Sequence, residues 1–539
     1  MSDDIDADVI IVGSGISGAL MASRLAAGGV KVAILEAGAK VDRHRAVENF
    51  WNALDKVPEC PYPPVPQAMH PTSDNLDFWY QQVGPDKFAS TYVKVVGGTT
   101  WHWLGTCLRL LPNDFRLRSL YGQGVDWPIS YNDIEPFYGE AENEIGVSGD
   151  SAVDLGAPRT TPYPMAEIPQ TYLDKVFLKA LSGTAYEVRS TPQGRNSADR
   201  DNRPACCGNA SCIPVCPIQA KYDATVHVDK AVAAGATLHE QTNAVFVEVG
   251  PDRRVAAVRF KRWDGSEGRA TGKVFVIAAH AIETPRLLLN SRSEATPNGA
   301  ANSSDQVGRN LMDHPTQLSW AFANDPVWPY RGPLSTSGIE NLRDGDFRKQ
   351  RGAFRIEIGN DGWSWPTGAP ISTAQDLANQ GQRGSALNNA LAYQSARHVR
   401  LASLVEQPPD PANRVTLDDG LYDIYGVGLP RIAYRLDDYT KAGFAASVAA
   451  HDEIFAKLGA TQVTHSPDAQ GAGHIIGTAR MGEDPRSSVV DRDLRSHDHP
   501  NLFVLGSSVF PTSATANPTL TIAALAIRAV ASVKATIGG

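Results

Sequence analysis

The sequence is short of positive charge and contains no run of basic residues. Its 50 Lys and Arg are outnumbered by 59 Asp and Glu, which gives a net charge of -9. Proteins that bind nucleic acid contact phosphates through clustered cations, so this composition argues against that class of function.

Long apolar runs and a secretory leader are also missing. The most apolar candidate, residues 520–537, is interrupted by Arg528 and Lys534, so we expect an amphipathic helix there and no membrane span. Residues 1–8 are acidic and lack the basic start and apolar stretch of a signal peptide. Taken alone, the chain is therefore expected to be cytoplasmic.

The chain contains no internal repeat or low-complexity tract. Hydrophobic residues make up 42% of it and charged residues 20%, which is ordinary for a soluble globular enzyme. Its 539 residues are more than one compact core usually holds, and this length predicts two closely joined domains.

Cysteine is scarce, but four of the six cysteines fall within residues 206–216. Such clustering favours a metal centre over a disulfide framework. Cys207, Cys212 and Cys216 have the short spacing of iron–sulfur ligands, and a proline follows the last. The adjacent Cys206 and Cys207 point in different directions and are not both expected to reach one cluster. A zinc site using all four sulfurs and a disulfide-stapled loop are the alternatives.

A dinucleotide-binding motif opens the chain. The apolar residues 9–12 predict a strand, and Gly13-x-Gly15-x-x-Gly18 follows it directly. Residues 19–27 have helical periodicity, and a second strand over 31–35 ends at Glu36. The three glycines permit the tight turn, the approach of a pyrophosphate and close helix–strand packing, while Glu36 is positioned to accept hydrogen bonds from ribose.

Beyond this motif, the chain resembles the glucose–methanol–choline (GMC) oxidoreductases along most of its length. Within that family, the cysteine cluster and the Trp101-His102-Trp103 triplet look most like the large subunits of bacterial gluconate, fructose, sorbitol and glucose dehydrogenases. The matching segments, in chain order, are 8–18, 96–100, 281–289, 307–315, 413–416, 474–478 and 516–521.

The resemblance implies an α/β fold in which a Rossmann-like FAD-binding domain is interleaved with an α+β substrate domain. The FAD-binding domain is expected over 1–45, 90–145, 206–318 and 470–539. The substrate domain and its excursions are expected over 46–89, 146–205 and 319–469.

FAD is the cofactor that the resemblance implies, and the Glu36-Ala37 pair is more typical of FAD proteins than of NAD enzymes. The expected FAD-binding residues are Gly13, Gly15, Gly18, Glu36, Ala37, Gly97, Gly98, Thr99, His102, Gly506, Pro518 and Thr519. In some relatives a histidine positioned like His102 is covalently bonded to the flavin, and in others FAD is held without any bond. Covalent attachment at His102 is thus one hypothesis, and a hydrogen-bonding or packing role is the other.

Two further residues are expected to carry the chemistry. In the family, the histidine of the H-x-x-G-T element acts on the substrate hydroxyl, and this sequence has His474 there. Histidine titrates near neutral pH, which suits a base that removes a hydroxyl proton. Asn517 matches the position where relatives have His or Asn, and its amide can hydrogen-bond the substrate oxygen. It also suits a helix start, because Pro518 follows it.

The predicted function is an FAD-dependent dehydrogenase that oxidises a hydroxyl of a sugar, sugar acid or sugar alcohol by hydride transfer to flavin N5. The resemblance implies a [3Fe–4S] cluster held by Cys207, Cys212 and Cys216, while Cys206, Cys60 and Cys107 have no assigned role. Electrons would pass through the cluster to a cytochrome c or another acceptor.

The implied partners are a small subunit that carries an export signal and a multihaem cytochrome c subunit, with periplasmic localisation by co-export. The alternatives are an oxygen-using GMC sugar oxidase with structural cysteines and a non-catalytic flavoprotein subunit.

Overall fold

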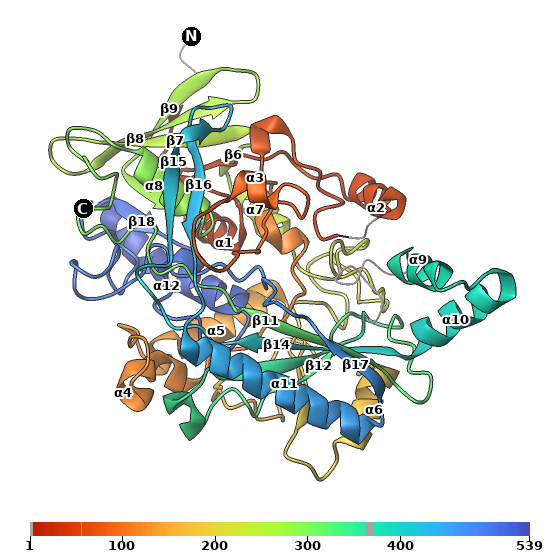
Figure 1. The fold of residues 1–539 in the computed structure, drawn as a ribbon. Helices are drawn as coiled ribbons and strands as arrows, with labels where there is room; N and C mark the ends of the chain where they lie inside the picture. The colour runs from red at the N-terminus through yellow and green to blue at the C-terminus, as the bar shows by residue number, and fades with distance from the viewer. Residues whose placement is uncertain (1–3, 55–56, 362–370, 539) are drawn as a thin grey trace.

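The computed structural model describes residues 4–54, 57–361 and 371–538. Figure 1 shows two regions, one built around a parallel sheet near both chain termini and the other around a larger antiparallel sheet. The predicted mixed α/β class is confirmed.

The parallel sheet has five strands in the order β18-β10-β2-β3-β6. Its neighbouring strands are parallel throughout. The central strands are apolar and buried along their whole length, as expected where helices or other elements cover both faces. The strands are β2 (Val9–Val12), β3 (Val32–Leu35), β6 (Thr237–His239), β10 (Val274–Ile277) and β18 (Leu502–Val504). The strands predicted at 9–12 and 31–35 are therefore present.

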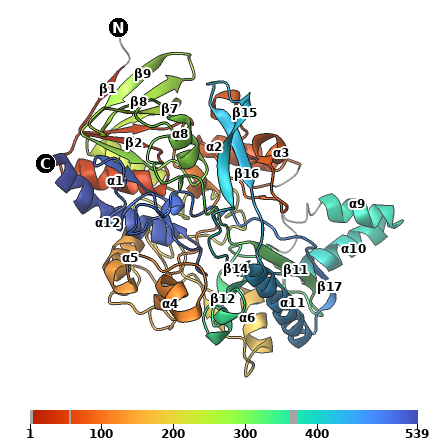
Figure 2. The same cartoon turned by 60° about the vertical axis from the view of Figure 1, so that its left-hand side comes forward.

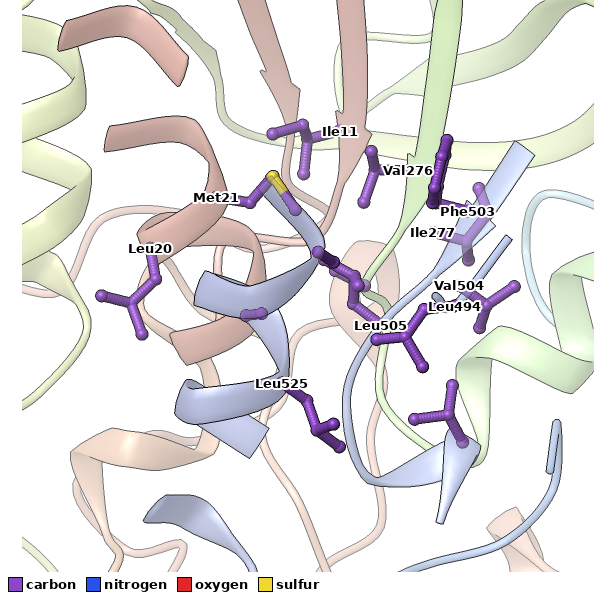
Figure 3. Close-up of a cluster of buried hydrophobic side chains, with 14 of the residues drawn as sticks. Ile11, Leu20, Met21, Val276, Ile277, Leu494, Phe503, Val504, Leu505 and Leu525 are labelled. Atoms are coloured by element: carbon purple, nitrogen blue, oxygen red, sulfur yellow. The ribbon is translucent and has the colours of Figure 1, made fainter. Parts of the chain in front are cut away.

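Two apolar helices pack beside this sheet and against each other. They are α1 (Ile16–Ala27) and α12 (Thr519–Gly538). Figure 3 shows Met21 of α1 beside Ile11 of β2, and Leu525 of α12 belongs to the same hydrophobic cluster. The helix α7 (Thr225–Ala233) packs on α1, and α5 (Tyr131–Ile145) packs on α12. This core fixes the turn between β2 and α1.

Helix α12 has the length and the hydropathy of a membrane-spanning helix, which the sequence analysis did not expect. It is long enough to cross a membrane and has a mean hydropathy of 1.6 over its most apolar window, although half of that window is buried inside the protein. Its Arg528 donates to the Arg492 carbonyl at 2.6 Å and pairs with Asp493 at 2.9 Å. These contacts, together with its packing on α1 and α5, identify α12 as a core helix.

Two smaller sheets flank the parallel one. The first has the order β1-β9-β8-β7, and its strands β7 and β8 form an antiparallel pair. The second has the order β15-β16-β4. Their strands are β1 (Ile5–Asp6), β7 (Thr242–Val249), β8 (Val255–Arg262), β9 (Glu267–Thr271), β4 (Gln81–Gln82), β15 (Arg414–Tyr422) and β16 (Gly428–Ala433).

The larger antiparallel sheet has six strands in the order β17-β11-β14-β13-β12-β5. Its strands are β5 (Val188–Ser190), β11 (Thr316–Phe322), β12 (Ser337–Ile339), β13 (Phe354–Gly359), β14 (His398–Val405) and β17 (Thr461–His465). Helices α6 (Tyr172–Ala180) and α11 (Asp438–Leu458) form a hydrophobic core with one face of this sheet. The opposite face of the sheet lines a cavity. The proposed domain boundaries stay a prediction.

The remaining helices lie around these sheets. They are α2 (Arg43–Asn52), α3 (Leu76–Trp79), α4 (Leu117–Tyr121), α8 (Glu283–Asn290), α9 (Ile371–Asn379) and α10 (Gly384–Arg397). Helices α9 and α10 project from the body of the molecule in both views (Figures 1 and 2).

Candidate active site

One cavity of about 1260 Å³ joins the two regions. Its lining includes Gly13, Gly15 and Glu36 from the glycine-rich turn, and also His474 and Asn517. Residues more than 500 positions apart in the chain therefore share one enclosed space. The predicted site residues lie in or around this cavity.

The three glycines of the first turn differ in what surrounds them. Gly13 has a φ of +101°, and a Cβ there would lie 2.5 Å from the Ala278 carbonyl oxygen. A Cβ on Gly18 would lie 2.0 Å from the Gly13 carbonyl oxygen, so only glycine allows this helix to pack so closely. Gly15, in contrast, has no atom within 4 Å of that position and lines the cavity. The open space beside Gly15 suits a pyrophosphate.

Glu36 lies at the end of β3 and is buried. Its carboxylate accepts hydrogen bonds from the Ser14 N–H at 3.0 Å, the Ser14 hydroxyl at 2.6 Å and the Gly38 N–H at 2.9 Å. Burial raises the pKa of Glu36, against the opposing effect of these donors. A carboxylate has about four acceptor sites, so these bonds leave room for a ribose hydroxyl.

The second glycine-rich loop lies directly against the first. A Cβ on Gly98 would lie 3.2 Å from the Gly15 Cα, and the Gly97 N–H donates to the Ser14 hydroxyl at 3.0 Å. His102 ends this loop, is buried, and has its Nδ1 3.3 Å from the Pro58 carbonyl oxygen. Burial lowers its pKa to about 3, so the imidazole is neutral. The other predicted residues that line the cavity are Ala37, Thr99, Gly506, Pro518 and Thr519.

The two predicted catalytic residues meet in the cavity. The Asn517 Nδ2 lies 3.3 Å from the His474 Nε2. The His474 backbone N–H donates to the Asp313 carboxylate at 3.0 Å, which fixes the start of the segment that carries it. Burial lowers the pKa of His474 well below 6.5, and the nearby His314 and Arg355 lower it further. A neutral histidine is the form that can accept a proton.

His314 is a functional candidate that the sequence analysis did not single out, although it lies inside the matching segment 307–315. Its Nε2 is 3.0 Å from the Ala514 carbonyl oxygen, and its Nδ1 is 3.0 Å from the His474 Nδ1. Burial lowers its pKa to about 4, so this ring is also neutral.

The Ala514 carbonyl determines which nitrogen of each ring carries hydrogen. A carbonyl only accepts, so His314 carries its hydrogen on Nε2 and has a bare Nδ1. The bare Nδ1 accepts a hydrogen from the His474 Nδ1. His474 therefore has its lone pair on Nε2, the nitrogen beside Asn517. His474 can therefore act as a base through its Nε2.

A polar face of the six-stranded sheet forms the wall opposite the turn residues. In β13, Arg355 and Glu357 alternate with the buried Phe354, Ile356 and Ile358. Because successive side chains of a strand point to opposite faces, the apolar set packs under α11 and the charged set faces the other way. Glu357 lines the cavity together with the residues that are aligned with this charged face on the strands β11 and β14. These residues are Thr316, Leu318, Trp320, Arg400, Ala402 and Leu404.

This face carries paired charges. Arg400 donates to Asp361 at 2.8 Å and lies 3.8 Å from Glu357. A Cβ on Gly359 would lie 2.6 Å from the Arg400 guanidinium, so glycine at that position leaves room for it. The alternation of charged and apolar residues at 354–358 was the sequence signal for this face, and the sequence analysis did not use it.

Comparison with known proteins assigns the family. Models of the GMC oxidoreductases match residues 7–316 and 409–526. The chain belongs to the GMC oxidoreductase family. This confirms the resemblance identified from the sequence.

Relatives agree with the assignment along the whole chain. The protein is 38% identical over 538 residues to the fructose dehydrogenase large subunit of Gluconobacter japonicus, covering 98% of both chains. It is 24% identical to the gluconate 2-dehydrogenase flavoprotein of Pantoea cypripedii, covering 96% of this chain and 92% of that one. The crystal structure of pyridoxine 4-oxidase from Mesorbium loti has the same fold, with a TM-score of 0.63 at 18% identity, covering 98% and 99%.

The protein is therefore an FAD-dependent GMC oxidoreductase that acts on CH–OH groups. The residues present fit FAD on three grounds. The open space at Gly15 suits the pyrophosphate, Glu36 is an acceptor for ribose, and the cavity continues to His474 where a flavin ring would meet an alcohol.

The four cysteines in the loop of this GMC oxidoreductase differ in burial. Cys207 is exposed, whereas Cys206 and Cys216 are partly buried and Cys212 is buried. Burial raises the pKa of Cys206, and the nearby Cys212 and Cys216 raise it further. Cys206 is therefore close to the thiols of Cys212 and Cys216. The four loop cysteines form no disulfide with one another.

Within residues 4–54, 57–361 and 371–538, no three His, Cys, Asp or Glu side chains are arranged to hold a single metal ion. The set Cys207, Cys212 and Cys216 accordingly stays a prediction.

A buried lysine joins this loop to the cofactor loop. The Lys221 ammonium donates to the Trp101 carbonyl at 2.9 Å and to the Cys212 carbonyl at 2.7 Å, and the Lys221 N–H donates to the Cys216 sulfur at 3.4 Å. Ile213 of the cysteine loop lines the same cavity as His102. The thiols therefore lie beside the cofactor region.

Proposed function

We propose that this protein is a dehydrogenase for a sugar, sugar acid or sugar alcohol, and that its electrons leave through an iron–sulfur cluster in the cysteine loop. The observation that carries the sugar assignment is the polar wall of the cavity. Glu357, Asp361 and Arg400 line the same cavity as His474, and Trp320 is paired with Arg400 across neighbouring strands.

Such a wall suits a polyol better than an apolar alcohol. Carboxylates and a guanidinium can hold neighbouring hydroxyl groups through paired hydrogen bonds, and an indole packs against the C–H face of a sugar ring. The wall holds both signs of charge, so it offers donors and acceptors together. The similarity to the fructose dehydrogenase large subunit supports the same substrate class.

The chain's own residues prepare the alcohol for oxidation. The alcohol O–H takes the place of the Asn517 N–H at the bare Nε2 of His474, and the Asn517 amide, which lies 3.3 Å from that nitrogen, then donates to the alcohol oxygen. His474 takes the hydroxyl proton as the carbinol C–H bond breaks, and a C=O double bond forms. His314 accepts the hydrogen bond from Nδ1 of the resulting imidazolium and stabilises its charge. FAD, when bound, supplies the acceptor for the hydride.

The cluster proposal rests on the chemistry of the cysteine loop. Cys212, Cys216 and one of the adjacent pair Cys206 and Cys207 would supply three thiolate ligands, which suits a [3Fe–4S] centre. Cys206 is less exposed than Cys207, which favours it as the third ligand. A one-electron relay beside the flavin region serves an external acceptor, for which we propose a cytochrome c subunit.

A small subunit with an export signal would bring the complex to the periplasm, and fractionation of cells tests this. Recovery of the whole protein from the cytoplasm would argue against export.

Anaerobic mixing with fructose, gluconate, sorbitol and glucose in turn tests the reaction. Rapid bleaching of the flavin absorbance by one of them is the expected result, and the H474A variant should bleach at least 100-fold more slowly. Failure of all four to bleach FAD-loaded protein would argue against a sugar substrate. Rapid peroxide formation in air would instead favour the oxygen-using oxidase.

A further inference from the structure

We propose that Arg355 is a positioning residue for alcohol oxidation, which orients the Asn517 amide so that its N–H groups face His474 and the substrate oxygen. This inference rests on the proposed function of His474 and Asn517. It adds a residue of the six-stranded sheet to a site otherwise built from the C-terminal segments.

An asparagine amide by itself has no preferred orientation. Its oxygen and nitrogen are similar in size, so the neighbours decide which one faces the substrate. If the Asn517 oxygen faced inward, it would offer an acceptor to the alcohol and to the bare Nε2 of His474. Two acceptors facing each other repel, and a developing alkoxide would be repelled too.

Arg355 removes this ambiguity because a guanidinium only donates. Its Nη1 lies 3.3 Å from the Asn517 Oδ1, which assigns the oxygen to the arginine side. The Nδ2 is then directed to the His474 Nε2 at 3.3 Å. The lone pair on Nε2, deduced above from the Ala514 carbonyl, is the one that this N–H requires. The hydrogen bond to the Ala514 carbonyl at one end and the hydrogen bond from Arg355 at the other therefore give the same orientation of the Asn517 amide.

The arginine itself is held in place on several sides. It is fully buried and donates to Glu340 at 3.0 Å, to Glu357 at 3.2 Å and to the Thr191 hydroxyl at 3.4 Å. A Cβ on Gly338 would lie 2.7 Å from the Arg355 Nη2, so glycine on the neighbouring strand leaves room for the guanidinium. A side chain fixed in this way can fix another in turn.

The local charge is balanced. Arg343 lies 3.8 Å from Glu340, and Arg400 lies 3.8 Å from Glu357. Arg355 is therefore flanked by two carboxylates that each have a second arginine nearby, and the charge it carries is compensated within the sheet. Thr191 and Asn517 are the neutral partners of Arg355, and Asn517 is the one that lines the cavity, so its orientation is the quantity that Arg355 controls.

A double-mutant cycle tests the inference. Single variants R355M and N517A and the double variant are compared in the anaerobic rate of flavin reduction, with whichever alcohol reduces the wild-type protein. We expect R355M to lower the maximal rate about 10- to 100-fold and to change the half-saturating concentration of alcohol less than threefold. In the N517A background the same substitution should cost less than threefold, because the amide it orients is gone. R355K, which keeps a donor, should recover part of the loss.

Multiplicative losses in the double variant would overturn the inference, since Arg355 would then act without Asn517. So would an R355M variant that reduces its flavin at the wild-type rate. If R355M does not bind FAD, the cycle is run with R355K, and additivity there overturns the inference equally. Failure of the proposed function is distinguishable, because in that case the wild-type flavin is not reduced by any alcohol supplied.

Discussion

Replacing His314 by alanine removes the acceptor for the His474 Nδ1 hydrogen. The two Nδ1 atoms are 3.0 Å apart, and the bond becomes charge-assisted when His474 takes the substrate proton. A hydrogen bond to a charged group contributes about 1.5–3 kcal/mol, which corresponds to about 10- to 150-fold in rate. H314A should therefore lower kcat/KM by that factor while FAD stays bound.

The matched control is H314N. The Asn Oδ1 occupies the same place in the side chain as the His Nδ1, so it keeps an acceptor for His474 and loses only the bond to the Ala514 carbonyl. It should retain more activity than H314A. Both variants are assayed by steady-state kinetics, with thermal unfolding and flavin content as controls for folding. An H314A enzyme within threefold of wild type, or an H314N enzyme as impaired as H314A, would refute the reasoning.

Four further outcomes are expected. Because burial keeps the pKa of His474 well below 6.5, kcat/KM should stay flat from pH 6.5 to 8 and fall only at more acidic pH, where the base becomes protonated; a pH profile checks this. Substituting Gly359 by alanine puts a Cβ 2.6 Å from the Arg400 guanidinium, so G359A should raise KM for a polyol about 10-fold and change kcat less than threefold in steady-state assays. Iron and sulfide analysis should show C206S depleted of iron and its neighbour variant C207S near the wild-type content, since Cys206 is the more buried of the pair. Acid precipitation distinguishes the two hypotheses for His102: a covalent bond predicts flavin that pellets with the wild-type protein and stays in the supernatant of H102A, whereas a hydrogen-bonding or packing role predicts flavin in the supernatant of both.

Each of these has a clear contrary result. An inflection in kcat/KM near or above 6.5 would mean that His474 is solvated in the free enzyme or that another group is the base. Unchanged polyol KM in G359A would remove Arg400 from substrate binding. Iron loss in C207S alone would restore the ligand set predicted from the sequence, and wild-type flavin found wholly in the supernatant would exclude covalent attachment.

Local chemistry made the cofactor half of the site predictable. The β-α-β unit from Val9 to Glu36 needs a strand, a turn and a helix that are adjacent in the chain, and the turn tolerates only glycine at Gly13 and Gly18. The apolar strands and helix α12 were also predictable from short apolar segments of the sequence. Their periodicity depends on residues a few positions apart, which is why the sequence alone indicates them.

The polar wall was harder to find, although part of its signal is present. Arg355 and Glu357 alternate with apolar residues, which marks a strand with one polar face. A charged strand face is usually exposed to solvent, and nothing nearby in the chain shows that this one is fully buried. The burial comes from partners elsewhere in the chain, since Glu340 and Asn517 are 15 and 162 residues from Arg355. Arg400 is 43 residues from Glu357.

By itself, the sequence determined the family, the FAD-binding turn and the identity of His474 and Asn517 as the residues to examine, because each is encoded in a contiguous motif. Only the tertiary structure decided that His314 holds one side of His474, that Arg355 holds the far side of Asn517, and that Cys206 is more buried than Cys207. The physical reason is that hydrogen-bond direction and burial are properties of the neighbours in space. Those neighbours are brought together by the packing of two sheets around one cavity.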